Sequence, residues 1–153
     1  MIAAAVTEPF SLPVRVRYVE CDMQGRVFNA HYLTWFDMAH TDALHQVTGL
    51  SYAELLRTHG IDFVVAESNV RYRAPAHYDD RLDVVVAFDP PTTSSLTSRF
   101  TVVRDGTTLT EGMLRHVCVD AAAFTKAPWP DPVREALAGY AAGVSSERPS
   151  RPT

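Results

Sequence analysis

Lysine is almost absent from this sequence, and acidic residues outnumber basic ones. Its 153 residues include a single lysine, Lys126, and the 18 Asp and Glu against 14 Lys and Arg give a formal net charge of −4. Proteins that bind nucleic acid mainly use clustered Lys and Arg to neutralise its phosphates. We therefore expect no nucleic-acid partner.

Long apolar segments are also missing. No apolar run approaches the roughly 20 residues that a membrane-spanning helix needs. The first ten residues, MIAAAVTEPF, lack the basic start and apolar middle of a signal peptide. We therefore expect a protein without a membrane partner, located in the cytoplasm.

Cysteine and histidine are too sparse or too irregularly spaced for a metal centre. Cys21 and Cys118 are too few for a disulfide framework and show no metal-ligand spacing. His31 and His40 are offset by nine positions and His40 and His45 by five, so neither pair has the i,i+4 geometry of helical metal ligands. We predict no metal and no cofactor, and we expect the histidines to be core or surface groups.

The composition is that of one ordinary globular domain. Hydrophobic residues make up 46% of the chain and charged residues 21%, and the length is sufficient for a sizeable core. We expect a flexible leader over residues 1–11, a folded domain over 12–142 and a disordered, polar, Pro-rich tail over 143–153.

Periodicity predicts an α+β domain. Alternation of apolar and polar residues is typical of half-buried strands, and apolar residues three and four positions apart are typical of helices. Strands are expected over 11–20, 61–74, 81–88, 94–104 and 107–119, and helices over 29–47, 51–59 and 131–142. The order of strand, helices, strands and terminal helix fits the α+β class.

Local signals support several of these boundaries. Asp105-Gly106 predicts a tight hairpin between the last two strands, and Ser51 with Glu54 forms a capping-box pattern. The helix over 29–47 is apolar on more than one side, which predicts a helix buried almost all round and wrapped by the sheet.

The junction between the first strand and this long helix carries the most chemistry. Asp22 and Gly25 form a polar turn, and Asn29 is expected to cap the helix with its side chain. The turn therefore holds an acid near a helix N-terminus, whose free N–H groups and dipole favour negative charge. From the spacing alone, Asp22 is more often a residue that merely orders a turn.

The same junction carries a family resemblance. It reads Asp22-x-x-Gly25-x-Val27-x-Asn29-x-x-Tyr32-Leu33-x-Trp35. Further matches follow in order at Tyr72-x-Ala74-Pro75, Tyr78-Asp79-Asp80-x-Leu82 and Val117-Cys118-Val119-Asp120. Together they resemble the hotdog-fold acyl-CoA thioesterases, and most of all the 4-hydroxybenzoyl-CoA thioesterase and Tol–Pal-associated thioesterase groups. The resemblance covers residues 12–140.

The resemblance implies a single hotdog domain, in which a curled antiparallel sheet wraps a long central helix, and an enzyme that hydrolyses a thioester of CoA or of an acyl-carrier protein. Asp22 would act as nucleophile or general base, and the amide of Asn29 would donate to the oxyanion. Substrate contacts would come from Gly25, Val27, Tyr32, Ser94 and Ser95. Pairing of sheet edges between subunits implies a homodimer or homotetramer.

The chain departs from its relatives at two places. Some relatives carry His or Tyr at Asn29, although a backbone donor does not depend on the side chain. The basic residues that commonly precede Ser94 and Ser95 are replaced by Pro-Pro-Thr-Thr at 90–93, which removes expected CoA phosphate contacts.

Alternative functions follow from the same resemblance. No Glu occurs between Glu20 and Glu54, so the hotdog branch that uses a helical Glu is not matched. One alternative is a hotdog enoyl-CoA hydratase or dehydratase, which would use another Asp/His motif that is not found here. The other is a non-catalytic acyl-CoA-binding protein, which would have no need for the carboxylate of Asp22. Glu20 itself is expected to be solvated or paired with Arg15 or Arg17, and it would face Asp22 only if the strand continued.

Overall fold

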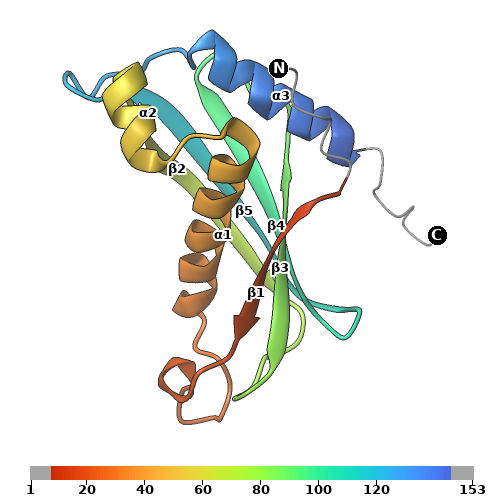
Figure 1. Ribbon diagram of the computed structural model, residues 1–153. Coiled ribbons are helices and arrows are strands. Elements are labelled where there is room, and N and C mark those ends of the chain that lie inside the picture. The colour runs from red at the N-terminus through yellow and green to blue at the C-terminus, as the bar shows by residue number, and fades with distance from the viewer. Residues whose placement is uncertain (1–7, 146–153) are drawn as a thin grey trace.

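The sheet is antiparallel and has five strands. The computed structural model describes residues 8–145, and the strand order is β1-β3-β4-β5-β2 (Figure 1). The strands are β1 (Phe10–Arg15), β2 (Ile61–Tyr72), β3 (Arg81–Phe88), β4 (Ser95–Arg104) and β5 (Thr107–Asp120). The helices are the 3₁₀ helix η1 (Tyr18–Glu20) and the α-helices α1 (Ala30–Thr48), α2 (Tyr52–His59) and α3 (Asp131–Ser145). The expected α+β class is confirmed.

The core lies between α1 and the curved sheet, with α3 crossing one end (Figure 1). Phe36 of α1 is fully buried and stacks on Phe100 of β4, with ring centroids 4.6 Å apart. A Cβ atom at Gly112 of β5 would lie 2.2 Å from the Phe36 ring. Glycine at this position therefore lets the central helix approach the sheet closely.

One side of α1 faces outward, so the expectation of a helix buried almost all round is wrong for a single chain. Leu33 is 37% exposed and Met38 is 48% exposed, whereas Trp35 and Phe36 are buried as expected. The physical reason is that five strands cover only the side of α1 turned toward them. The apolar residues on the other side have no cover within the described residues 8–145.

The first strand is shorter than its alternation predicted. β1 ends at Arg15, and the chain then turns through η1, so the expected strand over 11–20 is wrong in its second half. The cause is local, because the Glu20 carboxylate accepts a hydrogen bond from the Arg17 N–H at 2.8 Å and closes a tight turn. Glu20 forms the expected ion pair with Arg17, but its side chain is buried and not solvated.

Turn and cap signals are confirmed elsewhere. Ser51 Oγ accepts from the Glu54 N–H at 3.2 Å, while the Glu54 carboxylate accepts from the Ser51 N–H at 2.7 Å. At the β4–β5 hairpin, Asp105 and Gly106 have φ values of 48° and 77°, as a tight primed turn requires.

The two ends of the folded domain differ slightly from the expected boundaries. β1 begins at Phe10, inside the expected leader, and α3 continues to Ser145, inside the expected tail. The remaining parts of those two expectations, residues 1–7 and 146–153, lie outside the described residues. No helix in the described chain is long and apolar enough to cross a membrane.

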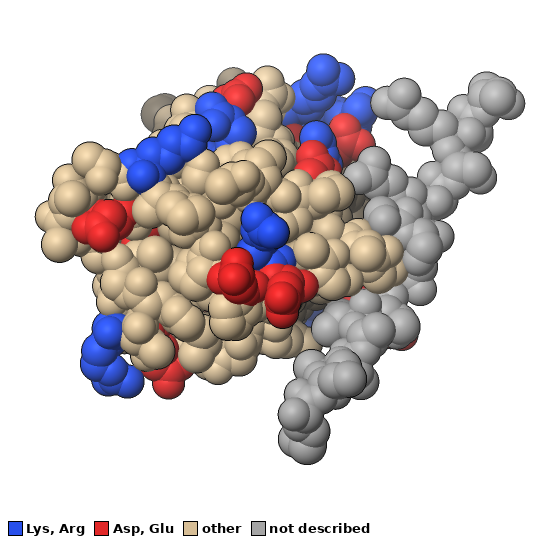
Figure 2. Space-filling model, turned by 90° about the horizontal axis from the view of Figure 1, so that it is seen from above, with Lys and Arg blue, Asp and Glu red and all other residues tan. Residues whose placement is uncertain are grey.

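β2 is an edge strand. It pairs with β5 on one side, with a bulge between Val65 and Glu67, and within residues 8–145 no strand pairs with its other side. At the opposite edge of the sheet lies β1, so the two edges are formed by strands from the beginning and middle of the chain. On the face shown in Figure 2, Lys and Arg lie beside Asp and Glu and form no broad patch of one sign.

Candidate active site

The turn between η1 and α1 is closed by its own backbone. The Asp22 N–H donates to the Arg26 carbonyl at 2.8 Å, and the Gly25 N–H donates to the Asp22 carbonyl at 3.0 Å. Gly25 has a φ of 73°, a conformation that glycine adopts without strain. Cys21 and Val27 form an isolated antiparallel bridge at the base of the turn. The turn is thus a small, well-defined platform for Asp22.

Asp22 both orders this turn and faces a cavity. One carboxylate oxygen, Oδ1, accepts from the Gln24 N–H at 2.8 Å, which is the turn-ordering role that its spacing suggested. The other oxygen has no hydrogen-bond partner in the described part of the chain. Asp22 is half-buried and lines a cavity of about 390 Å³. The two roles are therefore compatible.

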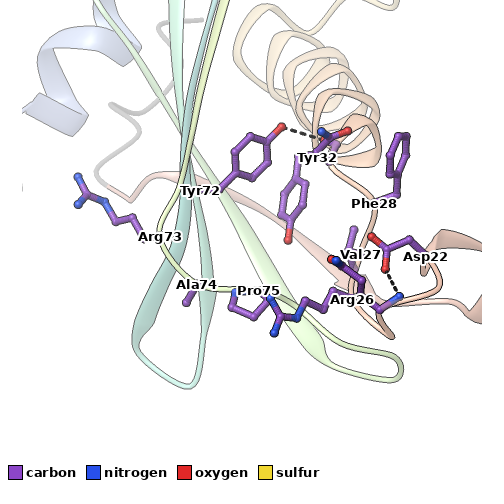
Figure 3. Close-up of a pocket in the computed structure, with 11 residues that line it drawn as sticks. Asp22, Arg26, Val27, Phe28, Tyr32, Tyr72, Arg73, Ala74 and Pro75 are labelled. Carbon is purple, nitrogen blue, oxygen red and sulfur yellow. Dashed lines mark hydrogen bonds between the residues drawn. The ribbon is translucent and has the colours of Figure 1, made fainter.

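The cavity lies between the turn, the start of α1 and the end of β2 (Figure 3). Its lining residues are Asp22, Gln24, Arg26, Val27, Phe28, Asn29, Tyr32, Tyr72, Arg73, Ala74 and Pro75. Two segments that are far apart in the sequence thus meet at one cavity. The segment that contains Tyr72 lies across the cavity from the segment that contains Asp22.

Asn29 lies at the N-terminus of α1, but its side chain does not cap the helix. Its backbone is already helical, with φ −53° and ψ −34°, and its side chain makes no cap hydrogen bond. The expected cap is wrong because a capping side chain reaches the first-turn amides from an extended backbone. Instead, the Tyr72 hydroxyl donates to the Asn29 carbonyl at 3.0 Å and ties β2 to the helix start (Figure 3).

The fold does not use the amide of Asn29, at the start of α1. The Phe28 N–H is already used, because it donates to the Glu20 carbonyl at 2.9 Å. The Asn29 N–H donates to no acceptor within residues 8–145. A helix N-terminus with an unused N–H stabilises negative charge placed beside it.

Of the predicted substrate contacts near Asp22, Val27 and Tyr32 line the same cavity as Asp22, whereas Gly25 does not. Val27 and Tyr32 are 7% and 2% exposed and form part of the cavity wall. Tyr32 packs edge-on against Tyr72, with ring centroids 5.4 Å apart. Gly25 lines a separate hollow of about 650 Å³, which Asp22 also lines.

Ser94 and Ser95 are not brought to this cavity within one chain. Ser95 lies opposite Val117 on β5, whereas Tyr72 lies opposite Thr110 on the same strand. At about 3.3 Å per residue, the two positions are roughly 20 Å apart along the sheet. Ser94 is buried, and its carbonyl accepts from the Cys118 N–H at 2.7 Å.

Positive charge borders the cavity at Arg26 and Arg73. The Arg73 guanidinium pairs with Glu111 at 2.8 Å. Arg26 was not singled out from the sequence, although its place in the turn four positions after Asp22 is a usable signal. Burial raises the pKa of Tyr32 and of Tyr72 above the usual value, so both hydroxyls keep their protons near neutral pH.

Glu20 is a second carboxylate near the turn, but it does not line the cavity. Burial alone would raise the pKa of Glu20, but hydrogen bonds from the Arg17 backbone and side chain and from Trp35 outweigh it and lower the pKa below the usual value. The carboxylate is therefore ionised near neutral pH. Among the described residues, no group of three or more His, Cys, Asp or Glu is arranged to hold a metal ion.

The sequence profile of the thioesterase-like superfamily matches residues 16–137. The acyl-CoA thioester hydrolase YbgC of Escherichia coli O6:H1 is 33% identical over 115 residues, which cover 74% of this chain and 84% of YbgC.

Solved structures agree in fold. The hypothetical protein TT1821 of Thermus thermophilus is 28% identical, with a TM-score of 0.78 over 87% of this chain and 99% of that one. SAV2348 of Staphylococcus aureus, solved in complex with CoA, has a TM-score of 0.87 over 97% of this chain and 92% of its own, at 15% identity. At that identity the second likeness concerns the fold alone.

Proposed function

The chain belongs to the thioesterase-like superfamily, and we propose that it is an acyl-CoA thioesterase whose reacting carboxylate is that of Asp22. The membership agrees with the resemblance read from residues 12–140. The observation that carries the proposal is that Asp22, which has an unpaired carboxylate oxygen, and Asn29, whose amide is unused, line one cavity.

The proposed reaction needs an attacking oxygen and a donor for the charge that develops. Asp22 either attacks the thioester carbonyl itself or removes a proton from an attacking water. The carbonyl oxygen becomes negative as the new C–O bond forms, and the Asn29 N–H donates a hydrogen bond to it. The C–S bond then breaks, and the thiolate leaves and takes up a proton. In the nucleophilic form, water hydrolyses the resulting mixed anhydride and regenerates Asp22.

The substrate is proposed to be a thioester of CoA or of an acyl-carrier protein. Val27 and Tyr32 would contact the acyl group from the cavity wall, and Gly25 would let the substrate approach the turn closely. The pantetheine arm would contact Ser94 and Ser95.

We propose that two copies complete this site by pairing along β2. The unpaired edge and the exposed Val65, at 53%, support such pairing. If the two β2 strands pair in antiparallel fashion, the first residues of one strand lie beside the last residues of the other. The start of β4 is level with the first half of β2 in its own subunit. It would therefore lie level with the Tyr72 end of the partner's strand. The Ser94–Ser95 segment would then approach the cavity of the partner subunit. A homodimer, or a homotetramer built from two dimers, follows.

A cytoplasmic location is also proposed. Both cysteines are free, with Cys118 buried and Cys21 half-buried, as is usual in a reducing compartment.

The test is thiol release from short, long and aromatic acyl-CoA substrates. Asp22→Asn and Asp22→Ala are compared with the wild type, and Asp42→Asn on the exposed side of α1 is the matched control. We expect the Asp22 variants to lose at least a hundredfold in kcat while remaining folded, and the control to keep its turnover. Full turnover in Asp22→Ala would overturn the proposal.

The same assays separate the alternatives. Hydration of an enoyl-CoA, without thiol release, would indicate a hotdog hydratase. Tight acyl-CoA binding without turnover in any variant would indicate a binding protein. Turnover of acyl-carrier-protein thioesters but not of CoA thioesters would identify the donor.

A further inference from the structure

Glu20 is a buried charge that the proposed chemistry does not use. Its residue is 3% exposed, although it stands only two positions before Asp22. Oε1 accepts from the Arg17 N–H at 2.8 Å and from Arg17 Nε at 3.3 Å. Oε2 accepts from the indole N–H of Trp35 at 3.0 Å. Burying a carboxylate is unfavourable in free energy, because the group loses its hydration. These hydrogen bonds compensate for that loss and hold the carboxylate in one orientation.

The backbone of Glu20 also binds the C-terminal end of the turn that carries Asp22. The Glu20 carbonyl accepts from the Phe28 N–H at 2.9 Å, which closes the loop that carries Asp22. Trp35, 2% exposed, lies on the buried side of α1. Glu20 therefore closes the loop of Asp22 through its backbone and connects that loop to α1 through its side chain.

We propose that Glu20 is a positioning residue for thioester hydrolysis, because its carboxylate locks the Asp22 turn against α1 and so sets Asp22 relative to the Asn29 amide. This inference rests on the proposed function of Asp22. The distance between the attacking group and the oxyanion donor governs the rate, and a misplacement of about 1 Å can cost on the order of a hundredfold.

Glu20 does not itself take part in the reaction. It does not line the cavity that Asp22 faces, and both of its oxygens accept hydrogen bonds. Its two side-chain partners contribute differently. The Arg17 side chain is 73% exposed, so its ion pair is screened by water, whereas the indole of Trp35 is buried.

The variants remove this lock one partner at a time. Glu20→Gln keeps the shape but places an amide NH₂ against either the Arg17 or the Trp35 donor. Trp35→Phe keeps an aromatic ring and removes the indole donor. The double variant shows whether the two residues act through one contact. Arg17→Ala is the matched control, because it removes the exposed partner and keeps the backbone donor.

Two readouts are measured on folded protein. We expect Glu20→Gln to lower kcat at least tenfold with KM changed less than threefold, and Arg17→Ala to change kcat less than threefold. Trp35→Phe should lower kcat in the same direction, and the double variant should be no worse than Glu20→Gln. The second readout is the rate at which a thiol reagent labels Cys21, which is half-buried beside Asp22.

Cys21 labelling reports the turn without any assay of activity. Cys118 is fully buried and burial raises the pKa of its thiol to about 11, so it stays silent, and a Cys118→Ser background verifies this. We expect Cys21 in Glu20→Gln to react at least fivefold faster than in the wild type, because the turn is released from α1.

The outcomes separate the two proposals. Full turnover in Asp22→Ala overturns the proposed function. Turnover lost in Asp22→Ala but kept in Glu20→Gln and Trp35→Phe, with unchanged Cys21 labelling, overturns the positioning role alone. A kcat that falls only in proportion to the folded fraction also overturns it. If Glu20→Gln does not fold, the kcat and Cys21 labelling of Trp35→Phe decide.

Discussion

The imidazole rings of His40 and His116 lie stacked in the core, with centroids 3.9 Å apart and 9° between their planes. His40 Nδ1 lies 2.9 Å from Ser98 Oγ, whereas His40 Nε2 and His116 Nδ1 have no hydrogen-bond partner in the described structure. The rings of Phe63 and Phe88 pack around the pair. The core therefore holds two polar rings that are stable only when neutral.

Acid should destabilise the fold through this pair. Burial, and then the charge of His116, lowers the pKa of His40 well below its usual value, and burial lowers that of His116 to about 4. In the unfolded chain both groups titrate at about pH 6.5, so below that pH the unfolded state binds more protons. We expect the free energy of unfolding to fall as the pH decreases from about 6.5 to 4, by about 3 kcal/mol from His116 alone.

The measurement is the urea midpoint against pH at fixed protein concentration. His116→Phe should remove roughly half of the loss, because a phenyl ring fits the aromatic cluster and does not titrate. His45, exposed on α1, provides the control, and His45→Gln should keep the wild-type slope. An unchanged slope in His116→Phe would contradict the assignment.

Gly112→Ala should be strongly destabilising. The added Cβ would lie 2.2 Å from Phe36, whose ring is buried and stacked on Phe100. Overpacking of this kind costs about 1–3 kcal/mol. Chemical denaturation measures the change, and Gly139→Ala in α3, where nothing lies within 4 Å, should instead stabilise by roughly 0.5–1 kcal/mol. Equal effects of the two changes would contradict the packing argument.

The adjacent residues Asp79 and Asp80 should contribute unequally to the free energy of unfolding. Asp80 accepts from the His77 N–H at 2.8 Å and from the partly buried Arg104 at 2.6 Å, beside the loop that borders the cavity. Asp79 makes a single exposed pair with Arg15. Asp80→Asn should lower the free energy of unfolding by about 1–2 kcal/mol. Asp79→Asn should cost less than about 1 kcal/mol, since exposed pairs are weak and asparagine tolerates the φ of 67°.

Both Asp variants are read from urea midpoints at pH 7. A larger loss for Asp79→Asn than for Asp80→Asn would reverse the ranking and refute it.

Tyr72→Phe should affect turnover more than stability. The change removes the hydroxyl that donates to the Asn29 carbonyl, while the residue is 51% exposed. We expect a fall in kcat of about threefold to tenfold and a loss of less than about 1 kcal/mol in unfolding free energy. Steady-state kinetics and urea denaturation measure the two effects. Tyr140→Phe, which removes a hydroxyl of α3 that donates to the Val86 carbonyl and does not line the cavity, should leave kcat unchanged.

Local patterns predicted the elements well because their causes are local. The capping box of Ser51 and Glu54 and the turn at Asp105-Gly106 involve residues three or fewer positions apart. The turn of Asp22 and Gly25 has the same short range, and the family resemblance drew attention to it. One prediction failed at the end of β1, because a side chain competed with the sheet for the backbone, and alternation carries no signal for that competition.

The sequence by itself determined the fold class, the place of the Asp22 turn before a long helix, and the family, because these depend on short-range periodicity and motif spacing. Only the tertiary structure decided which groups meet across the chain. It brought Tyr72 to Asn29, turned Glu20 into the core against Trp35, and stacked His40 on His116. These contacts depend on how the sheet curves around α1, a property of the packed chain that no local pattern encodes.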